Sequence, residues 1–597
     1  MNRSTLARRY APLAALAAVQ LLIIATIPSV GANQQASQVA GGGYGTGGST
    51  SSGVGAGSGS LGGSSSGGGS GGGASGVGGA SGLAGASGES GLNGSGSLPS
   101  GGSLLPPGVA TSGDTTHCVD GREWSTAIAY WAPPCVPGTP GAPDPDNGGA
   151  TTMGVTSNEI NVIDYESDDG AEDDAIEAAE GLYETFAQAE EVDGVYENFI
   201  NKYYVLYGRK FNIIPYMGQC NTVPPDTNCL IPEMDKLAAQ YHPLAVFWGS
   251  TVCSACFAEL ARDHVIAVGP AGFSDAFADA NAPYFYSESE SSTRMEEAFA
   301  EFYCKQLANS PVKFALNGNP AQNFNGHKRV LGLISANDPD NEDTVKDVLV
   351  PALKRECGVN VTHFYFYAQN INTAAQQTAA GIAAMDTPTN PATSVLCLCD
   401  TTAPVFFYEG EKADNYFPEN LIAATEGMDV DEAAQAYDSG VACTGGKPCP
   451  FDSAFGLGPN GPEEPGANDE GARMYHDGGG GTPPGNALSN DITALTYTMF
   501  ANLLENNGPD ITAANIQARA PELPAVGGGA SDQALLKFLP GDYSWEQDAR
   551  VIYWDADRTS SFDGEQGTYV QIEGGRFNLG QYPTLYEPPI PNQPRPS

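Results

Sequence analysis

Short apolar runs alternate with longer amphipathic segments through most of residues 151–427. Each run is four to eight residues long and is followed by a polar or glycine-containing loop, which is typical of buried parallel strands. The runs predict strands at residues 160–163, 210–216, 245–248, 265–268, 329–334, 363–368, 394–398 and 421–424. Two further strands are expected late in the chain, at residues 550–554 and 568–572.

The segments between these runs have the spacing of helices. The predicted helices cover residues 171–190, 195–206, 232–240, 257–263, 292–307, 344–357, 373–385, 491–505 and 515–519, and one more begins at 404. Strand and helix alternate, which implies α/β architecture with parallel sheets covered on both faces. The pattern restarts near residue 292, so we expect two doubly wound parallel-sheet lobes joined by a hinge.

The first 150 residues have a different composition. Residues 1–32 combine Arg3, Arg8 and Arg9 with an apolar run and the small residues Val30-Gly31-Ala32, as in a secretory signal peptide. The apolar run is about 17 residues long, at the lower limit for a membrane span, so an N-terminal anchor is the alternative. Residues 33–107 form a Gly/Ser-rich segment that we expect to be disordered, and residues 108–150 form a Cys/Pro-rich arm.

The formal net charge of −44 excludes the basic surfaces that nucleic acids and anionic membranes require. Twelve cysteines in an exported chain indicate disulfides. The local pairs expected are Cys118–Cys135, Cys220–Cys229, Cys253–Cys256 and Cys443–Cys449. Cys304 and Cys357 have no clear partner, and we expect Cys397 and Cys399 to bond elsewhere rather than to each other. With six His and no ligand cluster, neither a metal nor a cofactor is predicted.

Polar residues recur where the predicted strands end, which is where parallel sheets bind ligands. In the first lobe, hydroxyls and backbone N–H groups would suit a carboxylate, and in the second, carboxylates would suit an ammonium group. The predicted ligand-binding residues are Trp248, Ser250, Thr251, Gly272, Ser274, Asn337, Asp338, Asp400, Thr401 and Glu426. Phe273 is a further candidate for an apolar wall. The alternative for each Ser, Thr and Asp is an ordinary helix N-cap. The acidic run 164–174 lacks the spacing of a calcium loop, so we interpret it as the solvated start of a helix.

Several stretches, in their order along the chain, resemble the type I periplasmic binding proteins of branched-chain amino acid ABC importers. They are Gly-Val-Thr-Ser-Asn-Glu-Ile at 154–160, Asn-Lys-Tyr-Tyr at 201–204, Cys-Ser-Ala-Cys-Phe-Ala at 253–258, Tyr-Asp-Ser-Gly at 437–440, Ala-Phe-Gly-Leu-Gly at 454–458 and Val-Ile-Tyr-Trp-Asp at 551–555. The resemblance implies three crossovers between the lobes and closure on a ligand by a hinge. It places residues 151–287 and 428–540 in lobe 1, residues 288–427 and 541–585 in lobe 2, and residues 586–597 in a tail.

The resemblance implies an extracytoplasmic, monomeric solute-binding protein with no catalytic residues. It would capture a small polar solute, an amino acid or an amide, and deliver it to ABC permease subunits. The Pro-Asp-Asn at 339–341 replaces the family's usual Tyr-Gly, so a branched-chain ligand is not implied. The alternative is a surface module of the same fold that senses or adheres, held to a membrane or cell wall through the N-terminus.

Overall fold

The computed structural model describes most of the chain from residue 117 to residue 591. The described residues are 117–167, 174, 176–178, 183–248, 253–269, 271–316, 319, 321–424, 428–438, 449–466, 468–484, 487–529 and 531–591. The predicted signal segment and Gly/Ser linker, together with Ser250, Thr251, Glu426 and Cys443, lie outside them. Within the described helices, none combines the length and the apolarity that crossing a bilayer requires.

The first sheet is five-stranded and entirely parallel, in the order β4-β3-β5-β6-β7. Its strands are β3 (Glu159–Glu166), β4 (Lys210–Met217), β5 (Ala245–Phe247), β6 (Ile266–Val268) and β7 (Phe285–Tyr286). Every residue of β5 and β6 is apolar and buried, as expected for parallel strands covered on both faces. A small hairpin of β1 (Cys118–Val119) and β2 (Arg122–Glu123) precedes this sheet.

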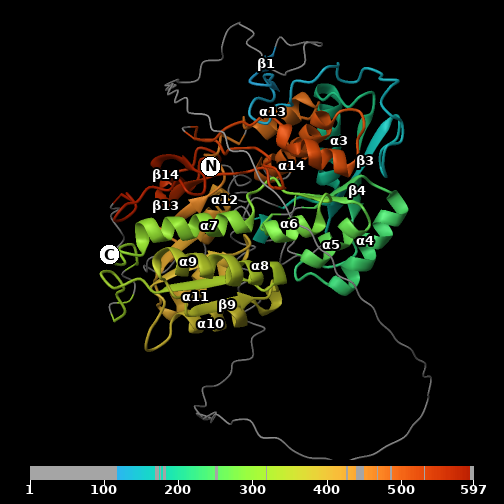
Figure 1. The fold of residues 1–597 in the computed structure, drawn as a ribbon. Helices are drawn as coiled ribbons and strands as arrows, with labels where there is room; N and C mark the ends of the chain where they lie inside the picture. Colours follow the sequence, from blue (N-terminus) through green and yellow to red (C-terminus); the bar gives the residue numbers. More distant parts are fainter. Residues whose placement is uncertain are drawn as a thin grey trace, which may run out of the picture. The chain divides into compact units, whose positions relative to one another are not determined.

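Helices cover this sheet, as Figure 1 shows for the blue-green and orange parts of the chain. They are α3 (Phe186–Tyr203), α4 (Thr227–Tyr241), α5 (Ser254–Arg262), α6 (Asp275–Asn281), α13 (Glu470–Asp477), α14 (Ala487–Asn507) and α15 (Ala513–Arg519), followed by the 3₁₀ turn η4 (Ala520–Glu522). The prediction of separate helices ending at 190 and starting at 195 was wrong: α3 is continuous. Its buried residues recur at helical spacing through Asp193, Tyr196 and Ile200, so Gly194 lies within one helix.

The second sheet is seven-stranded, in the order β14-β13-β12-β11-β10-β8-β9. Its strands are β8 (Leu331–Ala336), β9 (His363–Tyr367), β10 (Ser394–Leu398), β11 (Glu419–Ala423), β12 (Phe455–Gly458), β13 (Ala549–Thr559) and β14 (Gln566–Phe577). The first five pair in parallel, and the two late strands add antiparallel at one edge. The sequence predicted that two late strands would help to complete the second lobe, and β13 and β14 do so.

The helices around the second sheet are coloured green to yellow in Figure 1. They are α7 (Ser292–Phe302), η1 (Tyr303–Leu307), α8 (Pro339–Thr344), η2 (Val345–Leu349), α9 (Val350–Cys357), η3 (Ile371–Thr373), α10 (Ala374–Met385), α11 (Ala403–Asp414) and α12 (Asp431–Tyr437). The predicted helix at 344–357 starts earlier, at Pro339, where proline suits the first turn and Asp338 caps it. The fold class predicted from the sequence, α/β with two doubly wound lobes, is confirmed.

The cores divide the described residues into two lobes. Lobe 1 contains 117–287 and 468–548, and lobe 2 contains 291–466 and 549–591. The predicted assignment of 428–466 to lobe 1 was wrong, because β12 pairs with β11 and Met428 and Phe451 are buried in the core of lobe 2. The return to lobe 2 also comes at Ala549 rather than at 541, since Trp545 still packs in lobe 1. The described chain passes between the lobes three times.

Disulfides join Cys118 to Cys135, Cys220 to Cys229 and Cys253 to Cys256, as predicted. Cys449 is also disulfide-bonded, while its predicted partner Cys443 lies outside the described residues. The structure adds Cys304–Cys357, which ties η1 to the end of α9.

The prediction that Cys397 and Cys399 bond elsewhere was wrong, because they bond to each other. Cys399 lies just beyond the end of β10, and the Cα atoms of the two residues are 5.2 Å apart. This spacing is within disulfide reach and is shorter than two residues of extended strand would give.

Candidate functional site

A cavity of about 520 Å³ lies between the two lobes and is lined by residues of both. The five parallel strands of each lobe share one topology, in which the second strand, the first, the third, the fourth and the fifth lie side by side. In this order the connections diverge on either side of the first strand, and the crevice outside its carboxyl end is the usual ligand site. The cavity touches that position in lobe 1, at the ends of β3 and β5. In lobe 2 it touches the ends of β9 and β10, the two strands that flank the first strand β8.

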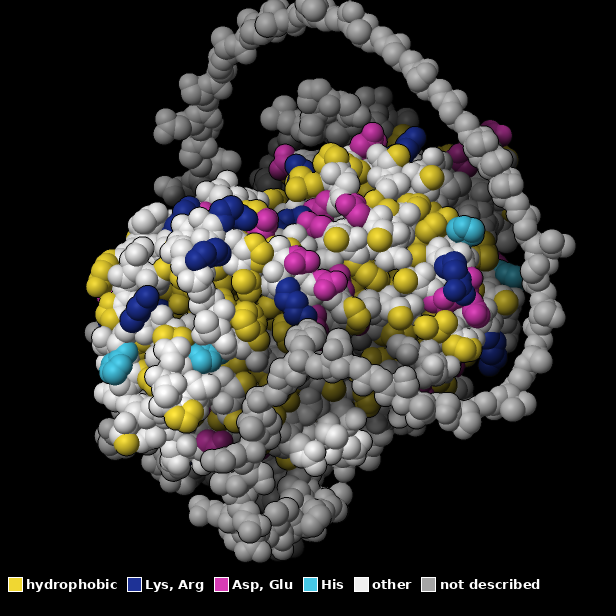
Figure 2. All heavy atoms as spheres, turned by 60° about the horizontal axis from the view of Figure 1, so that its bottom comes forward, with side chains coloured by type: hydrophobic (Ala, Val, Ile, Leu, Met, Phe, Trp, Pro, Cys, Tyr) yellow, Lys and Arg dark blue, Asp and Glu magenta, His cyan; other side chains and the backbone are white. Residues whose placement is uncertain are grey.

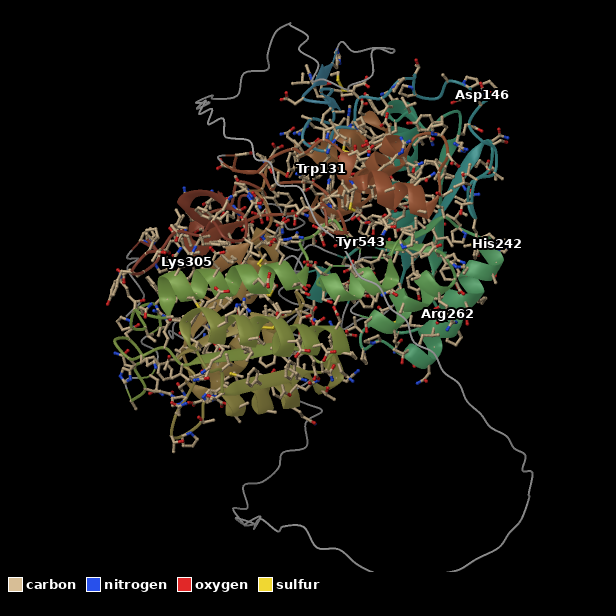
Figure 3. The ribbon with its side chains drawn as sticks, in the orientation of Figure 1. Trp131, Asp146, His242, Arg262, Lys305 and Tyr543 are labelled. Atoms are coloured by element: carbon tan, nitrogen blue, oxygen red, sulfur yellow. A yellow bond between two sulfur atoms is a disulfide. The ribbon has the colours of Figure 1, made fainter. Side chains whose placement is uncertain are left out.

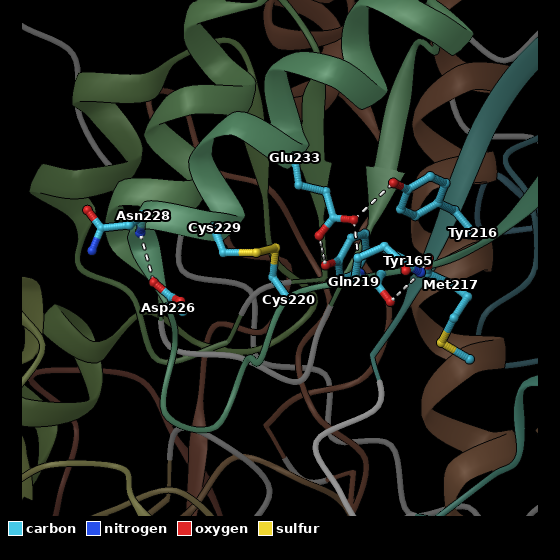
Figure 4. Close-up of a disulfide and its surroundings, with 10 residues drawn as sticks. Tyr165, Tyr216, Met217, Gln219, Cys220, Asp226, Asn228, Cys229 and Glu233 are labelled. Carbon is cyan, nitrogen blue, oxygen red and sulfur yellow. Dashed lines mark hydrogen bonds between the residues drawn. A yellow bond between two sulfur atoms is a disulfide. The ribbon is translucent and has the colours of Figure 1, made fainter.

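Aromatic side chains form the wall on lobe 1. Tyr165, at the end of β3, lies against Trp248, which follows β5, with ring centroids 4.4 Å apart. Glu233 on α4 fixes this wall, because it accepts hydrogen bonds from the Tyr165 hydroxyl at 2.9 Å and the Tyr216 hydroxyl at 3.0 Å (Figure 4). The Cys220–Cys229 disulfide closes the loop beside it. The indole Nε1–H of Trp248 is buried and has no acceptor among the described residues.

On lobe 2, Asp400 organises the opposite wall. One of its carboxylate oxygens accepts hydrogen bonds from the Tyr367 hydroxyl at 2.8 Å and the Gln369 amide at 3.0 Å. The other accepts from the backbone N–H groups of Thr402 and Ala403, at the start of α11. Asp400 therefore binds the start of α11 and also lines the cavity.

A second acidic group lies on the floor of lobe 1. We call Asp164, Glu166 and Asp193 the β3 carboxyl cluster; the first two line the cavity and Asp193 lies behind them on α3. Burial raises the pKa of Asp164 to about 6, although hydrogen bonds with Glu166 and Tyr497 lower it. Burial and the nearby charge of Asp164 raise the pKa of Asp193 to about 9 and that of Glu166 well above its usual range. Each carboxyl in the cluster therefore binds a proton more tightly than it would in water.

Other carboxyl groups of the cavity are perturbed in the same direction. Burial raises the pKa of Glu288 to about 8 and that of Asp469 to about 6. It raises those of Glu463, Asp491 and Glu546 as well, and neighbouring carboxylates reinforce the shift at each. One oxygen of Glu288 and one of Asp469 have no hydrogen-bond partner among the described residues, although both side chains are more than nine-tenths buried.

Among the described residues, three of the predicted ligand residues line the cavity. These are Trp248, Asp400 and Thr401. Ser250, Thr251 and Glu426 lie outside the described residues. Gly272, Ser274, Asn337 and Asp338 are described but are not among the described lining residues. Phe273 is buried in the core of lobe 1, against Phe257 and Phe285, so it is not a cavity wall.

Two of the predicted ligand residues, Ser274 and Asp338, form hydrogen bonds between the lobes. Ser274, the N-cap of α6 in lobe 1, donates to Asp340 of lobe 2 from its backbone N–H at 2.8 Å and from its hydroxyl at 2.5 Å. The Asp338 carboxylate likewise accepts from the Ser254 hydroxyl at 3.1 Å, at the start of α5. Burial raises the pKa of both carboxyls, while the serine hydrogen bonds lower it. The lobes are therefore held together by carboxylates of lobe 2 at helix starts of lobe 1.

Sequence reasoning missed several lining residues. Tyr130 and Trp131 belong to the Cys/Pro-rich arm, and Figure 3 places Trp131 near the orange C-terminal helices. Glu470 on α13 fixes this arm by accepting from the backbone N–H groups of Ala129, Tyr130 and Trp131 at 2.7–3.1 Å. The aromatic pair was visible in the sequence, but only the fold brings it to the cavity. Asp164 and Glu166, interpreted as part of a solvated run, are strand residues of its floor.

The sequence matches no protein-family model and no curated protein. Among solved structures, the chain resembles a possible leucine/isoleucine/valine-binding protein from Rhodopirellula baltica SH 1, at 12% identity and TM-score 0.45, over 69% of this chain and 96% of that one. It also resembles a fatty acid ABC transporter substrate-binding protein from Thermomonospora curvata, at 12% identity and TM-score 0.48, over 74% and 99%. A third is an ABC transporter substrate-binding protein from Desulfitobacterium hafniense in complex with Leu, at 11% identity and TM-score 0.41, over 69% and 100%. The structures that this chain resembles thus include solute-binding proteins of ABC transporters. Its fold class rests on its own topology, with five parallel strands in each lobe and three crossovers between the lobes.

Proposed function

We propose that this protein is an exported solute receptor, which captures a small polar molecule between its lobes and delivers it to an ABC-type permease. The observation that carries the proposal is the cavity of about 520 Å³ between the lobes, lined by residues at the carboxyl ends of parallel strands from both. Its size is typical of small-molecule sites, which span about 300–1,000 Å³. A site divided between two lobes couples binding to closure, because only the closed arrangement makes both sets of contacts.

The lining supports a polar solute with both donors and acceptors. The Trp248 N–H, which has no acceptor among the described residues, is suited to an acceptor on the solute, because a buried donor left without one costs free energy. Asp400 and the unpaired oxygens of Glu288 and Asp469 are suited to N–H donors. An amino acid or an amide has this combination, and we propose Trp248, Asp400 and Thr401 as contacts. Ser250, Thr251 and Glu426 are proposed to complete the site, and Gly272, Ser274, Asn337 and Asp338 to act at its margin.

Thermal unfolding of the secreted chain against a panel of amino acids, amides, amines and carboxylic acids tests this proposal. A true ligand at 100 times its dissociation constant adds about 2.7 kcal/mol to the free energy of unfolding, a clear rise in melting temperature. Trp248→Phe keeps the aromatic wall but removes the N–H, so it should weaken binding without lowering the melting temperature of the ligand-free protein. A panel in which no solute raises the melting temperature would overturn the proposal.

A sensing or adhesive module of the same fold is the second candidate. The 62 residues between 41 and 102, almost all Gly, Ser and Ala, favour it, because such a segment could hold a domain away from a surface. Cross-linking of the solute-loaded protein in its host separates the two. Capture of permease subunits supports transport, and capture of a sensor kinase or wall polymer supports the alternative.

A further inference from the structure

The charges around the cavity all have one sign among the described residues. Thirteen lining residues are Asp or Glu, and none is Lys, Arg or His. The chain as a whole has 26 Lys and Arg against 70 Asp and Glu, so an unselected set of charged residues of this size would include basic ones. On the face drawn in Figure 2, dark-blue and magenta side chains do lie among one another. The described lining of the cavity therefore differs from the surface, because it contains no basic side chains.

Some of these carboxyl groups have structural partners. Glu464 pairs with Arg473 at 2.9 Å, Glu470 binds the backbone of the arm, and Asp400 caps α11. These three carboxyl groups therefore have partners within the protein.

Asp469 and Glu288 differ, since each retains a buried oxygen with no partner among the described residues. Asp469 uses its other oxygen to cap α13 through the N–H of Ala472. An acceptor buried without a donor costs free energy, because it has lost its hydrogen bonds to water. A ligand that brings hydrogen-bond donors into the cavity would satisfy both of these oxygens.

Aromatic faces accompany the carboxyl groups. Tyr165 and Trp248 form one pair on lobe 1, Tyr130 and Trp131 come from the arm, and Phe407 follows Asp400 on lobe 2. A cation held over an aromatic face gains electrostatic energy from the ring, most when it is desolvated. Carboxylates with interleaved aromatic rings are chemically suited to ammonium or guanidinium groups carried on an apolar stem.

We propose that the solute of this site is an organic cation with net positive charge, of the basic amino acid or polyamine class. The inference rests on the proposed function, since it names the solute class of the same cavity. Burial disfavours the charged forms of these carboxyl groups, so a cation beside them would stabilise those forms. A neutral zwitterion would bring a negative charge together with its positive one, and an anionic solute would find no basic side chain among the described lining residues. A small inorganic cation would satisfy carboxylates but would leave most of a 520 Å³ cavity and its aromatic walls unused.

Isothermal titration of the full secreted chain with arginine, lysine, putrescine and spermidine tests this, with leucine, glutamate, Ca²⁺ and Mg²⁺ as comparisons. We expect at least one organic cation to bind at least tenfold more tightly than leucine, and glutamate not to bind. Asp469→Asn keeps the helix cap but removes the charge, and Asp164→Asn removes a floor carboxylate. Each should weaken binding of the cation at least tenfold, while Asp235→Asn, on an exposed part of α4 outside the cavity, should leave the affinity unchanged.

The outcomes are distinguishable. Preference for leucine or glutamate would keep the proposed function and overturn this inference, as would binding of Ca²⁺ or Mg²⁺ alone. Cation binding that Asp469→Asn and Asp164→Asn leave intact would place the cation elsewhere and also overturn it. If no solute in the panel binds, both the proposed function and this inference fail. Melting temperatures of both variants are measured beside the affinities, so that a loss of binding is distinguished from a loss of folding.

Discussion

The contact between Ser274 and Asp340 provides a quantitative test of whether the lobes interact as described. Ser274→Ala removes one hydroxyl, which donates to Asp340 across the lobes and also accepts from the N–H of Phe277 at the start of α6. A hydrogen bond to a charged group contributes about 1.5–3 kcal/mol. Asp340 is half-buried, which places the expected coupling near 1.5 kcal/mol. Loss of the α6 cap should cost roughly 1 kcal/mol in addition.

A double-mutant cycle separates the two effects. Urea unfolding of the wild type, Ser274→Ala, Asp340→Ala and the double variant should give a coupling free energy of about 1.5 kcal/mol, because the cap term appears in both arms and cancels. The same cycle with Ser125→Ala, a residue of lobe 1 that does not contact Asp340, should be additive within about 0.5 kcal/mol. Additive Ser274 and Asp340 variants would contradict the contact between the lobes.

Three further outcomes are expected. Arg329 and Glu419 form a fully buried ion pair at 2.7 Å, so Glu419→Gln should lower the free energy of urea unfolding by about 3–5 kcal/mol; a loss below 1 kcal/mol would contradict the pair. Replacing Cys304 and Cys357 together by Ser opens a crosslink between residues 53 apart and should cost about 4 kcal/mol in the chain-entropy description, measured by the same unfolding experiment. The β3 carboxyl cluster has raised pKa values when folded, up to about 9, so its contribution to stability is present at low pH and is lost as pH rises through these values. The ligand-free melting temperature should therefore be higher at about pH 5.5 than at about pH 8.5, and Asp193→Asn should reduce that difference; an unchanged difference would refute the role of the cluster.

The sequence predicts the parallel sheets well, because their strands are short apolar runs with clear polar ends. Residues 394–398 and 210–216 illustrate this, since the observed β10 and β4 match them to within one residue. β12 escaped prediction because its Phe-Gly-Leu-Gly has two glycines, which disfavour strands, and it adjoins a Gly/Pro-rich stretch. Gly456 nevertheless fits there, because a Cβ atom would lie 2.0 Å from the carbonyl oxygen of Ile422 on β11. That requirement comes from the neighbouring strand and has no local signature.

The site was predicted less well than the fold. Strand ends were located correctly, so Trp248 and Asp400, which line the cavity, were among the predicted residues. The position of a strand end does not determine which lobe a side chain there will face. Ser274 and Asp338 have the residue types of ligand contacts, and in the structure they form hydrogen bonds between the lobes. Asp164 was overlooked because an acidic residue before a predicted helix is usually solvated. Its burial depends on α14, which lies more than 300 residues away in the sequence and carries Tyr497.

The strands that cross between the lobes restrict how the molecule can move. The first and third crossings run side by side, with the N–H of Ser287 bonded to the carbonyl of Tyr543 and the N–H of Trp545 bonded to that of Ser287, both at 2.9 Å. Arg576 links the third crossing to the second, because it binds Asp548 at 2.8 Å and the carbonyl of Asn460 at 3.1 Å. A bundle of connected segments can twist but cannot easily slide, so opening should be a rotation with one degree of freedom. Amide exchange at Ser287 and Trp545 should consequently stay slow with and without bound solute. That result would identify these segments as the part of the molecule about which the two lobes rotate.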